Sequence, residues 1–181
     1  MNRKKFEYFL NAVHYCLWLN EKKAQRIMQK AVFSLMSFIA KCSSSYKIKL
    51  YERQTANLKK WRDYSNKSNG WSFTMAHNVF DFLFACYPGL FSFILAGVAI
   101  RIFGDFNLIV LLAFIAPGIL AFIYVDRAVV KNERYLKYFK NFEKEDEQWH
   151  RKWSRFTIAF CLGAILMFVI SMIAIWVVLL W

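Results

Sequence analysis

The chain has 181 residues, of which 58% are hydrophobic and 19% aromatic, and it carries a formal net charge of +13. This length suggests one domain, or one small domain with an appendage. A soluble globular domain rarely combines so much apolar content with so much positive charge, and here the two are separated along the chain. The composition therefore argues against an ordinary soluble domain and favours a membrane protein.

The N-terminal segment predicts an amphipathic helix over residues 5–20. Its basic start is followed by neither an uninterrupted apolar core nor a small-residue cleavage pattern, so we expect no removable signal peptide. One face of the helix is apolar, with Phe6, Leu10, Val13 and Leu17, and another carries Glu7, Asn11 and His14. We interpret the second face as a solvated polar stripe; the alternative is acid–base chemistry by Glu7 and His14.

A second amphipathic helix is predicted over residues 21–41, with Asn20 as its N-cap. Its basic flank holds Lys22, Lys23, Arg26 and Lys30, and its apolar stripe holds Ala24, Ile27, Met28, Ala31, Leu35, Phe38 and Ile39. The apolar run at 31–40 is too short to cross a bilayer. The helix therefore either lies in the membrane interface or packs on the first helix, and we favour packing.

A third, basic helix is predicted after the serines at 43–45, and residues 65–70 form a short hinge behind it. Its basic side chains are interleaved with aromatic ones and comprise Lys47, Lys49, Arg53, Lys59, Lys60 and Arg62. Such a face suits anionic lipid, a protein partner or single-stranded nucleic acid. Because a span begins shortly afterwards, lipid or protein contact is favoured over nucleic acid.

Three apolar runs without a charged side chain predict an all-α integral membrane protein with three transmembrane helices. The runs are residues 82–100, 106–125 and 156–181. A helix of about 20 apolar residues crosses a hydrocarbon core of about 30 Å. We place the first two spans, 79–100 and 106–125, in a hairpin within residues 71–127, and the third at 156–181. The alternative for the hairpin is a buried helical pair in a soluble domain.

The charge distribution predicts the orientation of the spans. Residues before 74 hold fifteen basic and four acidic side chains, residues 126–155 hold nine and six, and the loop at 101–107 holds one of each. Because lysine and arginine favour the cytoplasmic side, we predict an N-in, C-out protein. Residues 1–70 are then a basic cytosolic helical region and residues 128–155 a cytosolic stalk. We expect the membrane to be a bacterial inner membrane.

The stalk is predicted to continue the second span as a helix. Aromatic side chains recur along it at helical spacing, as in a packing seam within one subunit or between subunits: Tyr135, Phe139, Phe142, Trp149 and Trp153. The acidic cluster at 143–148 predicts a solvated turn before the third span.

The only two prolines lie inside the first two spans, and glycine follows each of them: Pro88-Gly89 and Pro117-Gly118. Proline removes a backbone hydrogen bond and kinks a helix, while glycine permits close approach. Because the two spans are antiparallel, both steps are expected at similar depth, which makes them candidates for a pore or gate. The best candidates for a proton or ion site are His77 and Asp81, four residues apart where span one begins.

The chain contains no nucleophile motif, phosphate-binding glycine loop or metal-ligand spacing, and its four cysteines show no CxxC pattern. We therefore expect neither an enzyme nor a cofactor nor a small-molecule substrate. The leading hypothesis is a homo-oligomer whose kinked hairpin forms or gates a pore, with the basic cytosolic region receiving a signal or partner. The alternatives are a non-conducting anchor or assembly subunit of a larger complex, and a membrane-tethered nucleic-acid binder. The layout resembles that of small bacterial membrane effectors in antiviral systems.

Overall fold

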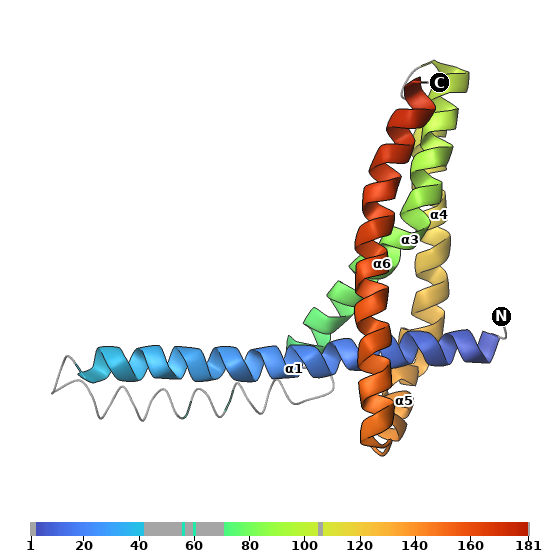
Figure 1. The fold of residues 1–181 in the computed structure, drawn as a ribbon. Helices are drawn as coiled ribbons and strands as arrows, with labels where there is room; N and C mark the ends of the chain where they lie inside the picture. The colour runs from blue at the N-terminus through green and yellow to red at the C-terminus, as the bar shows by residue number, and fades with distance from the viewer. Residues whose placement is uncertain (1–2, 42–55, 57–59, 61–70, 105–106, 181) are drawn as a thin grey trace. The chain divides into compact units, whose positions relative to one another are not determined.

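The computed structural model describes residues 3–41, 56, 60, 71–104 and 107–180, and these are folded into helices with no strand among them (Figure 1). This confirms the all-α prediction. In chain order the elements are α1 (Arg3–Lys41), α3 (Trp71–Phe103), α4 (Leu108–Val125), the π-helical turn η1 (Asp126–Val130), the 3-10 turn η2 (Lys131–Glu133), α5 (Arg134–Phe142) and α6 (Glu147–Leu180).

Three helical stretches are long and apolar enough to cross a membrane: Ser72–Phe103, Leu108–Val130 and Glu147–Leu180. They cover the predicted spans except for residues 106–107 and 181, so the prediction of a multi-pass membrane protein agrees with the length and composition of these helices. Apolar side chains such as Phe82, Leu120 and Leu166 are exposed on them. An exposed apolar surface of this extent suits hydrocarbon rather than water.

α1 corrects the prediction of two separate helices before residue 42. It is one helix of 39 residues, and Asn20 lies within it rather than at an N-cap. The segment from Arg3 to Lys41 has no glycine or proline to stop a helix. A single asparagine in a helix interior costs only a fraction of a kcal/mol, about 0.7 at most relative to alanine. The predicted packing of a second amphipathic helix back onto the first is therefore wrong.

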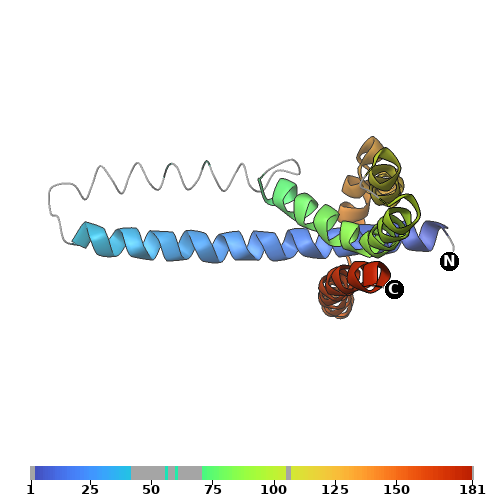
Figure 2. The same ribbon diagram turned by 90° about the horizontal axis from the view of Figure 1, so that it is seen from above.

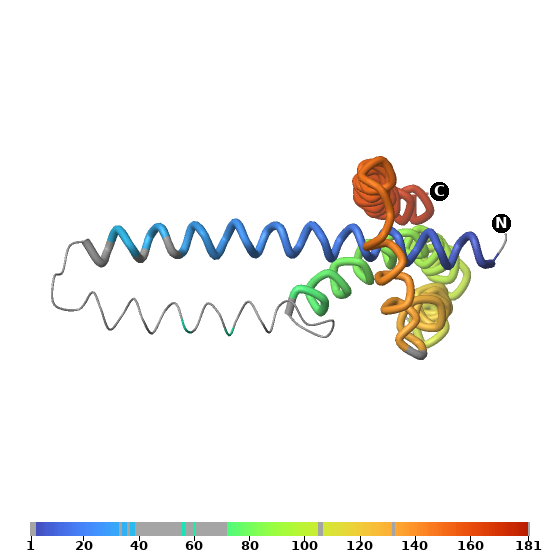
Figure 3. The backbone as a smooth tube through the Cα atoms, turned by 90° about the horizontal axis from the view of Figure 1, so that it is seen from below, coloured from blue at the N-terminus to red at the C-terminus, as the bar shows by residue number. Residues whose placement is uncertain are grey.

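The chain divides into two compact units. Unit 1 comprises residues 1–16 and 79–181, and unit 2 comprises residues 17–78. In unit 1, the first turns of α1 pass between α6 on one side and α4 with α5 on the other, as the views from above and from below show (Figure 2, Figure 3). In unit 2, the Ser72 hydroxyl at the start of α3 donates a 2.7 Å hydrogen bond to Gln25 Oε1 of α1.

The hairpin of α3 and α4 is closed by a short connection. Asn107 is the N-cap of α4, and its side-chain oxygen accepts hydrogen bonds from the amides of Ile109 and Val110 at 3.0 and 3.1 Å. Near this end Ala96 and Ala99 of α3 pack on Val110. Small side chains allow two membrane helices to approach closely, which explains why the hairpin is tight here.

The stalk does not continue α4 as a regular α-helix, contrary to the sequence-based expectation. After Val125 the chain forms η1, then η2, and Glu133 has a left-handed backbone with φ of 52°. A side-chain-bearing residue rarely adopts this conformation, and the change of hand here separates α5 from α4. α5 is consequently an independent helix that presents its own aromatic face.

Candidate functional site

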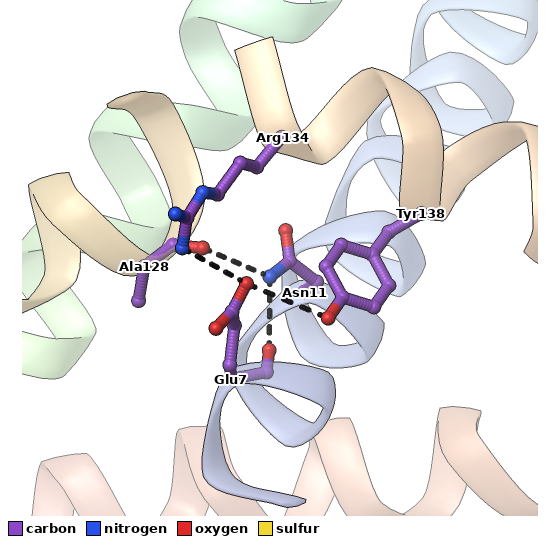
Figure 4. Close-up of polar contacts among 5 residues, drawn as sticks. All are labelled: Glu7, Asn11, Ala128, Arg134 and Tyr138. Atoms are coloured by element: carbon purple, nitrogen blue, oxygen red, sulfur yellow. Dashed lines mark hydrogen bonds and ion pairs between the residues drawn. The ribbon is translucent and has the colours of Figure 1, made fainter. Parts of the chain in front are cut away.

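A polar cluster joins α1 to the segment that follows α4 (Figure 4). The Asn11 amide nitrogen donates to the backbone carbonyl of Glu7 at 2.9 Å and to that of Ala128 at 3.3 Å. The Glu7 carboxylate forms a 3.3 Å ion pair with Arg134 and accepts a 3.5 Å hydrogen bond from the Tyr138 hydroxyl. These contacts connect positions 117 to 131 residues apart in the chain.

The π-helical turn η1 explains why a side chain from α1 is placed beside Ala128. A π-turn disrupts the regular hydrogen-bond pattern of an α-helix, and such turns recur at functional sites. Ala128 is buried, where an unpaired carbonyl is costly. Asn11 is fully buried and donates to this carbonyl. The side chain of α1 therefore stabilises the irregular exit from the second span.

An aromatic cluster lies around the polar contacts. The rings of Tyr8 and Tyr15 on α1 contact Phe142 of α5 at centroid distances of 5.2 and 5.6 Å. Trp149 of α6 stacks on Phe142 at 4.8 Å, and its indole nitrogen donates to the Tyr8 hydroxyl at 2.9 Å. Trp153 completes the cluster against Tyr8 at 5.7 Å. We call the polar and aromatic contacts together the joint.

The aromatic seam predicted from the sequence is thus placed inside the chain. Tyr135, Phe139 and Phe142 are buried, and Trp149 and Trp153 are half-buried. Their partners are the aromatic and histidine side chains of α1. The sequence left open whether this seam packs within a subunit or between subunits, and within unit 1 it packs against α1.

The polar stripe of the first helix is buried, so its interpretation as a solvated face is wrong. Asn11 and His14 have no exposed surface, and Glu7 is half-buried. The His14 ring contacts Phe80 at 5.2 Å and Phe139 at 5.5 Å between centroids. Glu7 and Asn11 bond to the chain beyond α4, while His14 packs among aromatic rings. The stripe therefore serves contact between elements rather than contact with solvent.

Burial raises the pKa of two tyrosines of the joint, Tyr15 and Tyr138. Burial, followed by the charge of Glu143 and the nearby Cys16, raises the pKa of Tyr15 to about 12. Burial also raises the pKa of Tyr138, with the Glu7 carboxylate adding to the effect and Arg134 opposing it. The shift extends the pH range over which the Tyr138 hydroxyl keeps its proton and donates to Glu7.

The two proline–glycine steps lie within continuous helices, and they share a small cavity. α3 runs through Pro88 and α4 through Pro117. A cavity of about 20 Å³ is lined by both helices, with Pro88, Gly118 and Asp81 among its residues. This volume holds about one water molecule. The structure therefore places Pro88, Gly118 and Asp81 around one cavity, whereas Gly89 and Pro117 are not among its lining residues. A Cβ added at either Gly89 or Gly118 would meet nothing within 4 Å.

His77 and Asp81 both lie on α3, on either side of the boundary between the two units. His77 belongs to unit 2, where its ring stacks on Phe73 at 5.9 Å, and Asp81 belongs to unit 1.

The predicted basic face lies mostly outside the described residues, which do not include Lys47, Lys49, Arg53, Lys59 and Arg62; Lys60 is described and is exposed. In the C-terminal half of α1 the predicted stripe is exposed at Ala24, Ile27, Met28, Ala31, Leu35 and Phe38, while the side chain of Ile39 lies outside the described residues.

Two glycines not singled out from the sequence mark close contacts between α3 and α6. A Cβ on Gly97 would lie 3.0 Å from Val178 Cγ1, and one on Gly163 would lie 2.8 Å from the Tyr87 hydroxyl. That hydroxyl donates a 2.7 Å hydrogen bond to the carbonyl of Phe160. Small residues at helix interfaces are the signal that identifies such positions, but only once the partner helix is known.

Among the described residues no group of three or more histidine, cysteine, aspartate or glutamate side chains could hold a metal ion. Cys16, Cys86 and Cys161 are free thiols. Comparisons with protein-family models, with curated proteins and with solved structures find no match to this chain. The joint is consequently the feature on which a functional argument can be built.

Proposed function

We propose that this protein is a membrane anchor that holds α1 at the membrane boundary, where the C-terminal half of α1 receives a protein partner. The joint supports this proposal most directly. Beside it, aromatic and histidine rings at the start of α1 contact all three predicted spans: Phe6 contacts Tyr124 of α4, Phe9 contacts Phe160 of α6, and His14 contacts Phe80 of α3.

The spans themselves favour an anchor over a conduit formed by one chain. Two hydroxyl side chains in the third span bond to the backbone of their own helix: Thr157 donates to the Trp153 carbonyl at 2.9 Å and Ser171 to the Met167 carbonyl at 2.6 Å. A hydroxyl bonded to its own helix leaves little to line a water-filled path. The exposed surface of these helices is apolar and suits lipid contact.

The second candidate function is a pore gated by an oligomer, and one observation favours it. Pro88 and Gly118, from the two proline–glycine steps, line one cavity together with the carboxylate-bearing Asp81. An ionisable side chain beside paired helix irregularities is a common arrangement at ion and proton paths. A conduit of this kind requires additional copies of the chain to enclose it.

Dye release from liposomes separates the two functions. For an anchor, we expect the purified, reconstituted protein to release no more dye than empty vesicles. The Pro88→Ala and Pro117→Ala variants should behave in the same way, because alanine is compatible with both helices. Release that depends on the wild-type protein and is lost in the proline variants would replace the anchor by the pore.

Site-specific photo-crosslinking in native membranes tests the partner surface. A photoreactive residue at Leu35, which is 62% exposed on the apolar stripe, should give a protein adduct of defined mass. The matched control is Ser37, which is also exposed on α1 but lies outside the stripe. Adducts of equal yield at both positions, or adducts with lipid alone at Leu35, would contradict a partner-receiving role.

A further inference from the structure

A basic surface on α6 lies where the charge-free run of the third span begins. A hollow on this helix is lined by Gln148, Arg151, Lys152, Arg155, Phe156 and Ala159. These positions are spaced three and four residues apart, which places them along one face of the helix. Three cationic side chains within about one turn are followed by the apolar Phe156 and, about one turn beyond Arg155, by Ala159.

The three basic residues of this surface are not among the residues of the joint. Trp149, Trp153 and Phe160 pack against α1. Phe156 lies at the edge between the two surfaces, because its ring also contacts Trp153 at 5.6 Å. Arg151 has 67% of its side chain exposed and forms a 2.8 Å ion pair with Glu147, which is 79% exposed. An exposed pair of this kind contributes little to stability, so an anionic ligand can compete for Arg151 at small cost.

We propose that Arg151, Lys152 and Arg155 bind the headgroup of an anionic phospholipid. Arginine presents a planar fork of donors that matches a phosphate group, and lysine adds a point charge. Phe156 and Ala159 lie where the glycerol and the upper acyl chains of such a lipid follow its phosphate. Cationic side chains next to apolar ones match the headgroup and the acyl chains of a phospholipid. A soluble phosphate ester has no acyl chain and gains nothing from Phe156.

The proposal depends on α6 crossing the membrane and is independent of what α1 binds. Basic side chains that lie at the depth of the lipid phosphates each contribute about 1 kcal/mol of attraction to an anionic lipid surface. Arg151, Lys152 and Arg155 are all exposed, so their replacement by glutamine removes charge without opening the packed core. Glutamine is also a good helix former.

The experiment is a lipid titration of the full-length protein in detergent, followed by native mass spectrometry. Phosphatidylglycerol and phosphatidylcholine with identical acyl chains are the two probes, and inorganic phosphate is the competitor. We expect the wild type to bind phosphatidylglycerol more tightly and inorganic phosphate not to displace it. The R151Q/K152Q/R155Q variant should bind phosphatidylglycerol roughly tenfold more weakly or worse, given the contribution of each basic residue.

The control variant K137Q/K140Q/K144Q removes three exposed positive charges from α5 and the turn after it. It should retain the affinity of the wild type, and circular dichroism should show equal helix content in all three proteins. Equal affinity for both lipids, equal loss in the two triple variants, or displacement of the lipid by inorganic phosphate would each overturn the proposal.

Discussion

Replacing Phe142 by alanine is expected to destabilise the joint by about 3–5 kcal/mol, the usual cost of truncating a buried phenylalanine. Phe142 is 1% exposed and its ring contacts Tyr8, Tyr15 and Trp149, so its removal opens a cavity where α1, α5 and α6 meet. The measurement is the free energy of unfolding in mixed detergent micelles, together with the near-ultraviolet circular dichroism of the aromatic cluster.

The matched control for this variant is Phe122→Ala. Phe122 lies on α4 at the edge of the Pro88–Gly118 cavity and is 58% exposed, so its truncation removes the same atoms from a largely exposed side chain. We expect its unfolding free energy and aromatic dichroism to remain close to those of the wild type. Equal destabilisation by the two substitutions would show that Phe142 is not part of a packed core.

Replacing Gly97 by leucine is expected to separate α3 from α6 near the end of the hairpin where α3 connects to α4. Even a single Cβ at this position would lie 3.0 Å from Val178 Cγ1 and 3.2 Å from Val178 Cβ, and the branched valine has little freedom to move. Overpacking of this kind typically costs about 1–3 kcal/mol, and more where a helix must shift. The readout is the detergent denaturation midpoint.

The Gly89→Leu variant provides the comparison within the same helix. A Cβ at Gly89 meets no atom within 4 Å, so leucine there should be accommodated without movement of α6. If Gly89→Leu lowered the denaturation midpoint as much as Gly97→Leu did, close packing at Gly97 would not be the cause.

The spans were predictable because their signal is local. Each is a run long enough to cross a bilayer, and the absence of charge over such a length has few other physical explanations. The aromatic spacing of Tyr135, Phe139 and Phe142 likewise identified a helix with a face to bury. Periodicity shows that a face is buried, but it does not show which element covers it.

The joint was not predictable because its determinants are far apart in the sequence. Asn11 looks like a surface residue until Ala128, 117 residues away, is found to present a carbonyl from a π-turn. Nothing in the sequence DRAVV announces that turn, since its residues all occur in ordinary helices. Gly97 and Gly163 were missed for the same reason, because the side chains facing them belong to other helices.

Hydrogen–deuterium exchange along α1 tests the central claim, that the start of this helix is docked by the joint. Residues 8–16 are largely buried, whereas the stripe side chains between residues 27 and 38 are exposed on the same helix. Because docking suppresses local opening, we predict that amides in the first segment exchange at least about tenfold more slowly than those in the second. The Phe142→Ala variant should remove most of this difference. Uniform exchange along α1 in the wild type would contradict the docking of α1 and, with it, the proposed anchor.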